Sequence, residues 1–148
     1  MKSAQSGNKK WMTSLVTIKP LYATDTNALF WYLTEDKKLS TDALAIFEAA
    51  ERAETQIVVS AIVLAELYYL DKKWKVFEDF IKIYRELESR PEFLFVSFEA
   101  EAVLDLITDA AIPEMHDRII TGLARRLGIP LITSDSKIIA ANLVEIVW

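Results

Sequence analysis

Short segments that are apolar throughout alternate along this chain with longer segments in which apolar residues recur every three or four positions. The short segments predict parallel strands buried on both faces, since such strands have no solvated side. The longer segments predict amphipathic helices. The predicted strands are residues 21–24, 56–59, 93–96, 130–133 and 144–147, and the predicted helices are residues 27–33, 41–50, 61–70, 74–88, 99–110, 114–127 and 136–141.

This alternation predicts an α/β fold, namely a three-layer α/β/α sandwich around a central, mainly parallel sheet of four to five strands. In such folds the ligand crevice lies beyond the carboxyl ends of the strands. Residues 1–19 show only weak periodicity and are expected to form a mobile N-terminal extension, with residues 20–148 as one domain.

The helix over 99–110 combines apolar and acidic positions. The apolar spacing predicts that Val103 and Ile107 face inward. Asp105 and Asp109 are then expected on a solvated face.

The composition narrows the possible chemistry. The chain has 148 residues, 17 Lys and Arg, 22 Asp and Glu, and a net charge of −5. The absence of Cys excludes disulfides and thiolate metal sites, and His116, the single histidine, excludes a centre of several imidazoles. No apolar run approaches the ~20 residues of a transmembrane helix, so a cytoplasmic protein without membrane contact is expected.

Four acids lie where this fold would bring the strand ends together. Asp25 directly follows the first predicted strand, and Asp135 follows the fourth. Glu66 lies among apolar neighbours in the helix after the second strand, and Asp117 opens the helix before the fourth. The four carboxylates are therefore expected to converge on one rim of the sheet. Taken singly, the three aspartates also suit a simpler role as caps of helix starts.

Four converging carboxylates cannot all stay ionised without a counter-charge. Oxygen ligands without Cys and with almost no His select hard cations such as Mg²⁺ or Mn²⁺. Such an ion retains water ligands and can activate one of them toward a phosphate. The predicted chemistry is metal-assisted hydrolysis of a phosphodiester.

Four segments carry these acids in order along the chain: Tyr22-Ala23-Thr24-Asp25-Thr26-Asn27-Ala28-Leu29, Ser60 through Leu67, His116-Asp117-Arg118-Ile119-Ile120 and Leu131-Ile132-Thr133-Ser134-Asp135. Together they resemble the PIN-domain ribonucleases, and most of all the VapC-type toxins of toxin–antitoxin pairs. The resemblance covers about residues 21–148. It implies a homodimeric endoribonuclease that uses Mg²⁺ or Mn²⁺ to cut single-stranded or looped RNA. It also implies a small cognate antitoxin that inserts a segment into the active-site groove.

The resemblance assigns roles to individual residues. It implies an acidic metal site made of Asp25, Glu66, Asp117 and Asp135. Asp25 and Asp117 are expected as direct ligands, and the other two acids as ligands either directly or through water. Asn27 and Thr133 match polar positions that orient these carboxylates.

Several bases lie near the proposed site. Arg118 and Lys137 are expected to contact RNA phosphates, whereas Arg125 and Arg126 lie near a helix end where bases suit the dipole. The segment 72–75, Lys-Lys-Trp-Lys, either holds a nucleic-acid strand or is the solvated end of a helix.

The aromatic pair Tyr68 and Tyr69 precedes that segment and is expected to fill a core or a dimer face. The non-catalytic alternative is an α/β binding module, and the catalytic one is another Mg²⁺-dependent phosphohydrolase. A phosphatase of the haloacid dehalogenase type needs a second Asp two positions after the first, where this chain has Asn27. A phospho-receiver domain needs an acidic pair near the first strand, which is absent.

The net charge of −5 fits a metal-dependent site. Without the four proposed ligands, 18 of the 22 acids remain against 17 bases, a balance of −1. A negative total therefore does not exclude RNA as a partner. It predicts that RNA binds poorly without the metal.

Overall fold

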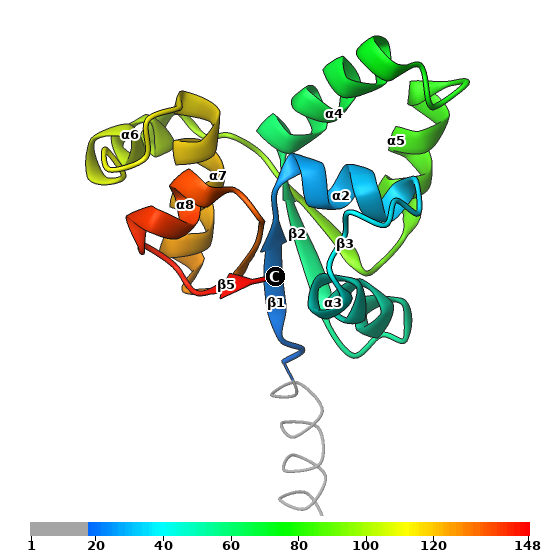
Figure 1. Ribbon diagram of the computed structural model, residues 1–148, viewed down its shortest axis with the longest axis horizontal. Coiled ribbons are helices and arrows are strands. Elements are labelled where there is room, and N and C mark those ends of the chain that lie inside the picture. The colour runs from blue at the N-terminus through cyan, green and yellow to red at the C-terminus, as the bar shows by residue number, and fades with distance from the viewer. Residues whose placement is uncertain (1–17) are drawn as a thin grey trace, which may run out of the picture.

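The computed structural model describes residues 18–148, so the predicted extension lies outside the described residues except for its last two positions. A five-stranded parallel sheet forms its centre, in the order β3-β2-β1-β4-β5 (Figure 1). Ala23 of β1 pairs with Val58 of β2 on one side and with Leu131 of β4 on the other. The strands are β1 (Leu21–Thr24), β2 (Gln56–Ser60), β3 (Phe93–Val96), β4 (Leu131–Ile132) and β5 (Ile146–Val147).

Helices cover the sheet on both sides, which confirms the predicted α/β/α sandwich. The first four, coloured blue to green in Figure 1, are α2 (Thr26–Leu33), α3 (Thr41–Glu51), α4 (Ala61–Trp74) and α5 (Phe80–Ser89). The later ones, coloured yellow to red on the opposite side, are the 3₁₀ helix η1 (Ala100–Leu104), α6 (Asp105–Thr108), α7 (Met115–Leu127) and α8 (Ser136–Ala141). The direction of the crossovers changes after β3, which moves the later helices to the other face.

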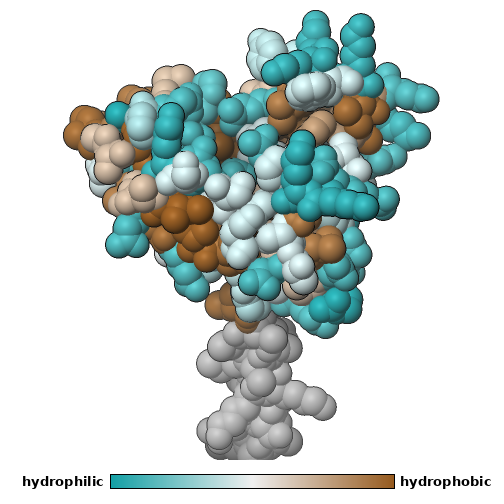
Figure 2. Space-filling view, in the orientation of Figure 1, coloured by the Kyte–Doolittle hydropathy of each residue, from teal (hydrophilic) through white to brown (hydrophobic). Residues whose placement is uncertain are grey.

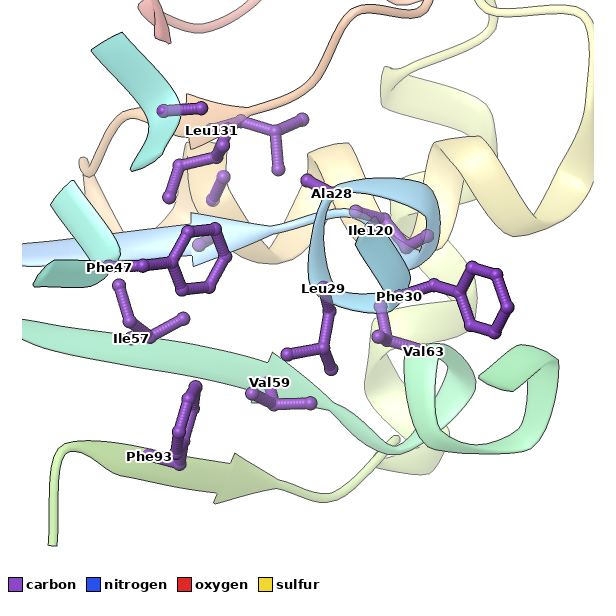
Figure 3. Packing of buried hydrophobic residues seen from close by; sticks show 14 of the residues in the cluster. Ala28, Leu29, Phe30, Phe47, Ile57, Val59, Val63, Phe93, Ile120 and Leu131 are labelled. Carbon is purple, nitrogen blue, oxygen red and sulfur yellow. The ribbon is translucent and has the colours of Figure 1, made fainter. Parts of the chain in front are cut away.

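The core forms where both helical layers meet the central strands (Figure 3). Ile57 and Val59 of β2 are completely buried, as expected for a strand that is apolar throughout. Leu29 of α2 and Phe47 of α3 pack into the same cluster. This packing fixes β1 and the start of α2, on which part of the candidate site is built.

The predicted helix over 74–88 is confirmed over residues 80–88, as α5, but its predicted start is wrong. Helix α4 continues to Trp74, a loop follows, and α5 begins only at Phe80. Lys75 adopts a left-handed backbone with φ of 52°, which ends α4. The side chain of Asp71 then accepts a hydrogen bond from the N–H of Phe77 at 2.8 Å and stabilises the turn. No Gly or Pro marks this break in the sequence.

The predicted orientation of the segment 99–110 is also wrong. Asp105 and Asp109 are buried, with exposed fractions of 6% and 0%, whereas Val103 and Ile107 are 48% and 76% exposed. Figure 2 shows hydrophobic side chains on the surface at the outer end of this segment. The apolar positions therefore face solvent and the acids face α7.

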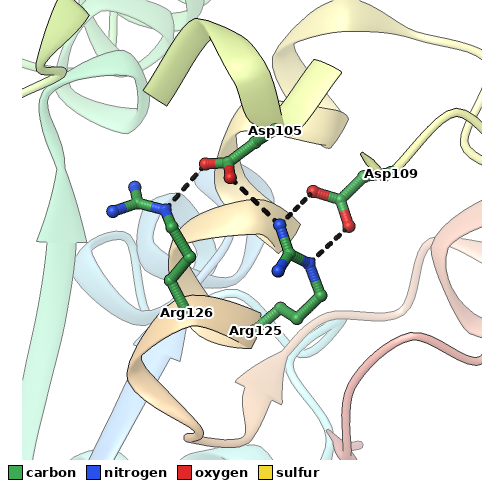
Figure 4. A network of polar contacts seen from close by, with 4 residues as sticks. All are labelled: Asp105, Asp109, Arg125 and Arg126. Atoms are coloured by element: carbon green, nitrogen blue, oxygen red, sulfur yellow. Dashed lines mark hydrogen bonds and ion pairs between the residues drawn. The ribbon is translucent and has the colours of Figure 1, made fainter. Parts of the chain in front are cut away.

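Ion pairs with two arginines of α7 explain this inversion (Figure 4). Arg125 Nε donates to Asp109 Oδ1 at 2.8 Å, and Arg125 Nη2 donates to Asp105 Oδ1 at 3.0 Å. Arg126 Nε donates to Asp105 Oδ2 at 2.8 Å. A Cβ at position Gly122 would lie 2.8 Å from the Cβ of Asp105, so the close approach of α6 needs this glycine. The two arginines thus hold α6 against α7. This role adds to the favourable interaction with the helix dipole that their position near the end of α7 predicts.

Among residues 18–148, no helix is both long enough and apolar enough to cross a membrane.

Candidate active site

A pocket of about 410 Å³ lies beyond the carboxyl ends of β1 and β4, where the topology predicts the ligand crevice. All four acids proposed from the sequence line it. The wall also includes polar, basic and aromatic side chains from α2, α4 and α7. Its lining residues are Asp25, Thr26, Asn27, Glu66, Tyr69, Leu70, Lys73, His116, Asp117, Ile120 and Asp135.

Asp25 is fixed by two hydrogen bonds at the junction of β1 and α2. Its Oδ1 accepts from the N–H of Ala28 at 2.8 Å, which caps α2, and its Oδ2 accepts from the hydroxyl of buried Thr133. The residue is only 8% exposed, and this burial raises its pKa from 3.8 to about 6. The two hydrogen bonds lower the pKa, while the charges of Asp135 and Glu66 raise it further.

Glu66 reaches the pocket from α4. Its Oε1 accepts a hydrogen bond from the hydroxyl of Thr26 at 2.7 Å, and its Oε2 lies 3.4 Å from Nδ1 of His116. The same imidazole nitrogen lies 3.5 Å from Oε1 of Glu114. The side chain of Glu66 is therefore oriented by polar groups from α2 and α7 and does not enter the apolar core.

Asp135 caps the start of α8, as Asp25 caps α2. Its Oδ1 accepts from the N–H groups of Lys137 at 2.8 Å and Ile138 at 3.1 Å. Its own N–H donates to the hydroxyl of Thr133 at 3.1 Å. Because Thr133 also donates to Asp25, one buried threonine joins the two aspartates at the ends of β1 and β4.

Asp117 does not cap its helix. Glu114 does so by accepting a hydrogen bond from the N–H of Asp117 at 2.8 Å, which leaves the carboxylate of Asp117 free to face the pocket. The pKa of Asp117 is raised from 3.8 to about 6. Burial is the largest cause, and the negative charges of nearby acids add to it, in decreasing order Asp135, Glu114, Glu66 and Asp25. The capping explanation thus holds for two of the three aspartates and fails for the third.

The structure does not bring every predicted site residue into the pocket. Asn27 lines it and is exposed. Arg118 instead donates to the backbone carbonyls of Leu106, at 2.9 Å, and Ile112, and so ties α7 to the segment before it. Lys137 is exposed at the start of α8 and does not line the pocket.

Other residues line the pocket that the sequence did not assign to it. Thr26 orients Glu66, and its position next to Asp25 is the only signal that points to it. Tyr69 is 70% exposed and lines the pocket, which excludes the core as its place and leaves the dimer face as the other expectation. Lys73 contributes a cation to the pocket wall. Its place two turns beyond Glu66 on α4 could have been noticed in the sequence.

The acidic residues supply the donor chemistry for a hard cation, although they surround a pocket and do not converge on one point. Within residues 18–148, no three Asp, Glu or His side chains are grouped closely enough, as they stand, to hold a metal ion. Carboxylate oxygens are the ligands that Mg²⁺ and Mn²⁺ prefer. The raised pKa values of Asp25 and Asp117 come partly from neighbouring carboxylates, and a bound cation would relieve that repulsion. The donor set therefore fits such a cation.

Solved structures share this fold at low sequence identity. The VapBC2 complex from Rickettsia felis, bound to a DNA fragment from its promoter, has a TM-score of 0.61 and 22% identity, with 85% of this chain and 96% of that chain covered. DNA-bound VapBC from Salmonella typhimurium has a TM-score of 0.60 and 14% identity, covering 87% and 97%. A toxin–antitoxin complex from Klebsiella pneumoniae has a TM-score of 0.58 and 20% identity, covering 88% and 97%.

The comparison with curated proteins gives no match. The comparison with protein families does, and the match begins at β1 and ends just after α8, so it includes all four acids of the pocket. Since the PIN domain family matches residues 22–142 of the 148, the chain belongs to the PIN domain family.

Proposed function

We propose that this chain is a metal-dependent endoribonuclease and the toxin of a toxin–antitoxin pair. The observation that carries the proposal is the gathering of Asp25, Glu66, Asp117 and Asp135 around one pocket at the carboxyl edge of a parallel sheet. The mutual effect of these carboxylates on the pKa values of Asp25 and Asp117 supports it, because it reflects an excess of negative charge that a cation would balance.

In this proposal Asp25 and Asp117 bind Mg²⁺ or Mn²⁺ directly, and Glu66 and Asp135 complete the site directly or through water. The bound ion would activate a water molecule toward the phosphorus of an RNA phosphodiester and neutralise the charge that develops there.

The protein's own residues hold the acids in place. Thr133 orients Asp25 through its hydroxyl, and Thr26 orients Glu66 in the same way. Such supporting hydrogen bonds restrict the carboxylates to few orientations, which lowers the entropy lost when they bind an ion. Lys73, on the wall of the same pocket, is placed to attract the phosphate that the acids alone would repel.

Cleavage of a mixed RNA pool tests the activity. We expect the protein to cut RNA with Mg²⁺ or Mn²⁺ and to lose the activity in EDTA. Asp25→Asn and Asp117→Asn should each lower the rate by roughly 100-fold or more, since loss of even a group that supports a ligand costs about 10–100-fold.

Asp42→Asn is the matched control, because Asp42 is an exposed aspartate in the first turn of α3 and lies outside the pocket. Robust cleavage in EDTA would contradict the metal mechanism. An inactive but folded wild-type protein that still binds RNA would favour a non-catalytic binding module.

We propose two protein partners for the chain. The Klebsiella pneumoniae structure of similar fold is a toxin–antitoxin complex, which supports a cognate antitoxin here. A second copy of the chain is the other, as the resemblance to VapC-type toxins implies. The exposed apolar side chains Val103, Leu104 and Ile107 provide a surface suited to such a contact.

A further inference from the structure

A second cavity, of about 500 Å³, lies beside the acidic pocket. It is formed by α2, the end of α4 and the loop that follows α4. Asn27 and Leu70 line both cavities, so the two adjoin each other along these helices. Its lining residues are Asn27, Phe30, Trp31, Thr34, Asp36, Lys38, Leu70, Trp74 and Val76. We refer to this second cavity as the tryptophan groove.

One face of α4 leads from the acids into the tryptophan groove. Glu66, Leu70 and Trp74 follow one another at intervals of four residues, which places them on the same side of the helix. Eight residues separate Glu66 from Trp74, or roughly 12 Å along the helix axis. A ligand held at the acids therefore reaches Trp74 only if it extends along the surface.

Exposed aromatic surface and lysines occur together in this groove. Trp74 is 60% exposed, which is unusual for the largest side chain. The Nζ of Lys73, a residue of the acidic pocket, lies 5.1 Å from the ring centroid of Trp74. In the groove lining that α2 and the residues after it contribute, Lys38 Nζ lies 5.9 Å from the ring centroid of Trp31 and 4.0 Å from the carboxylate of Asp36.

A solvated helix end explains only part of this arrangement. Lys72 and Lys73 suit the C-terminal end of α4 because cations are stabilised there by the helix dipole. The dipole gives no reason for Trp74 to be exposed beside them, or for its cavity to adjoin the acidic pocket.

We propose that the tryptophan groove is a stacking platform for a base of single-stranded RNA that neighbours the nucleotide held at the acids. This inference rests on the proposed ribonuclease function and adds a subsite to it. Aromatic rings stack on any base, and lysines alongside hold the phosphates, which is the usual combination in proteins that bind single strands. The position next to the acidic pocket, Lys38 in the groove lining and Lys73 beside the Trp74 ring favour RNA over a protein segment as the occupant.

Fluorescence anisotropy with a short single-stranded RNA tests the platform. To prevent cleavage, binding is measured in the Asp117→Asn background. We expect Trp74→Ala to raise the Kd for the single strand roughly tenfold, which corresponds to about 1.4 kcal/mol. Trp74→Phe should restore most of the affinity, because a phenyl ring still stacks. A duplex of the same sequence should bind equally to all three proteins, since its bases are already stacked.

The salt dependence of the Kd tests whether Lys73 contacts an RNA phosphate. Lys73→Ala should reduce the slope of log Kd against log salt by about 0.7, the change expected for one lost phosphate contact to a single strand. Lys82→Ala should leave the slope unchanged, since Lys82 is exposed on α5 and lines neither cavity.

An unchanged affinity for single-stranded RNA in folded Trp74→Ala would overturn the platform, and would leave the groove to a protein segment. Failure of the ribonuclease proposal is distinct, because it appears as a lack of cleavage by the wild-type chain whether or not Trp74 affects binding.

Discussion

Asp25 shows how one carboxylate can have a structural and a chemical role at once. It caps α2, accepts a hydrogen bond from Thr133 and still lines the pocket. The capping explanation and the ligand explanation are therefore compatible for this residue. Its burial is what raises its pKa most, so its charged form is less favoured than that of an ordinary aspartate, and a cation would favour it.

The raised pKa values predict how metal binding depends on pH. Asp25 and Asp117 both have pKa values of about 6, so a cation competes with protons below that pH. We expect Mg²⁺ or Mn²⁺ to raise the melting temperature fully at about pH 8 and very little at about pH 5. Thermal melts with and without the ion at each pH measure this, and Asp117→Asn should weaken the shift at every pH.

Without metal, Asp25 and Asp117 make the protein less stable as the pH rises, whereas the stabilisation by a bound metal increases with pH. Between pH 3.8 and about 6 the folded chain binds more protons at Asp25 and Asp117 than the unfolded chain does. Their contribution to the free energy of unfolding is therefore largest at low pH and is lost as pH rises through about 6. A metal-induced shift that stays constant from about pH 5 to pH 8 would contradict the assignment of these two acids as ligands.

At the scale of elements, α7 joins the acidic pocket to the segment formed by η1 and α6. Its first turn carries Asp117, and its last turn carries the arginines that bind Asp105 and Asp109. Between them, Arg118 donates to backbone carbonyls within α6 and in the loop after it. The ion pairs that hold α6 against α7 thus stabilise the same helix that carries a proposed metal ligand.

Arg125→Ala tests how much these ion pairs stabilise the fold. The variant leaves the completely buried carboxylate of Asp109 without its partner, so we expect the free energy of unfolding to fall by about 2–4 kcal/mol. Arg85→Ala is the matched control, because Arg85 pairs with Glu88 on the exposed face of α5 and its loss should cost less than about 1 kcal/mol. Urea denaturation of the three proteins gives both values. Equal costs for the two variants would show that the buried pair does not hold α6.

The elements differ in how far the sequence predicts them. The strands were predicted within a few residues, because a strand covered on both faces is apolar throughout and that pattern is local. The meeting of Asp25 and Asp135 followed from the same reasoning, since both residues directly follow strands of a parallel sheet. The orientation of the segment 99–110 was not predictable in this way. It depends on Arg125 and Arg126, which are remote in sequence from the aspartates they bind.

At the scale of the whole molecule, the surface formed by η1 and α6 exposes several apolar side chains close together. Val103, Leu104 and Ile107 are each about half exposed or more on η1 and α6, while Asp105 is turned inward. The proposed homodimer would bury these side chains.

Analytical ultracentrifugation tests that contact. We expect the wild-type chain to sediment as a dimer and Ile107→Asp to weaken the association at least roughly tenfold, because a charge would replace an apolar contact. Ile81→Asp is the control, since Ile81 is 68% exposed on α5, away from this surface. If Ile107→Asp sediments as the wild type does, the dimer uses another face or does not form.

The parallel direction of the five strands determines where a tag or label can be attached without covering the pocket. The described chain enters β1 from Pro20, at the edge of the sheet opposite the acids, so a fluorophore attached at that point lies at the far edge from the pocket. It leaves β5 at the same edge as the acids, and Trp148 packs 5.8 Å from Trp31, a wall of the tryptophan groove. A tag at that end would lie beside the groove, and the binding experiments above are best carried out with the last residue free.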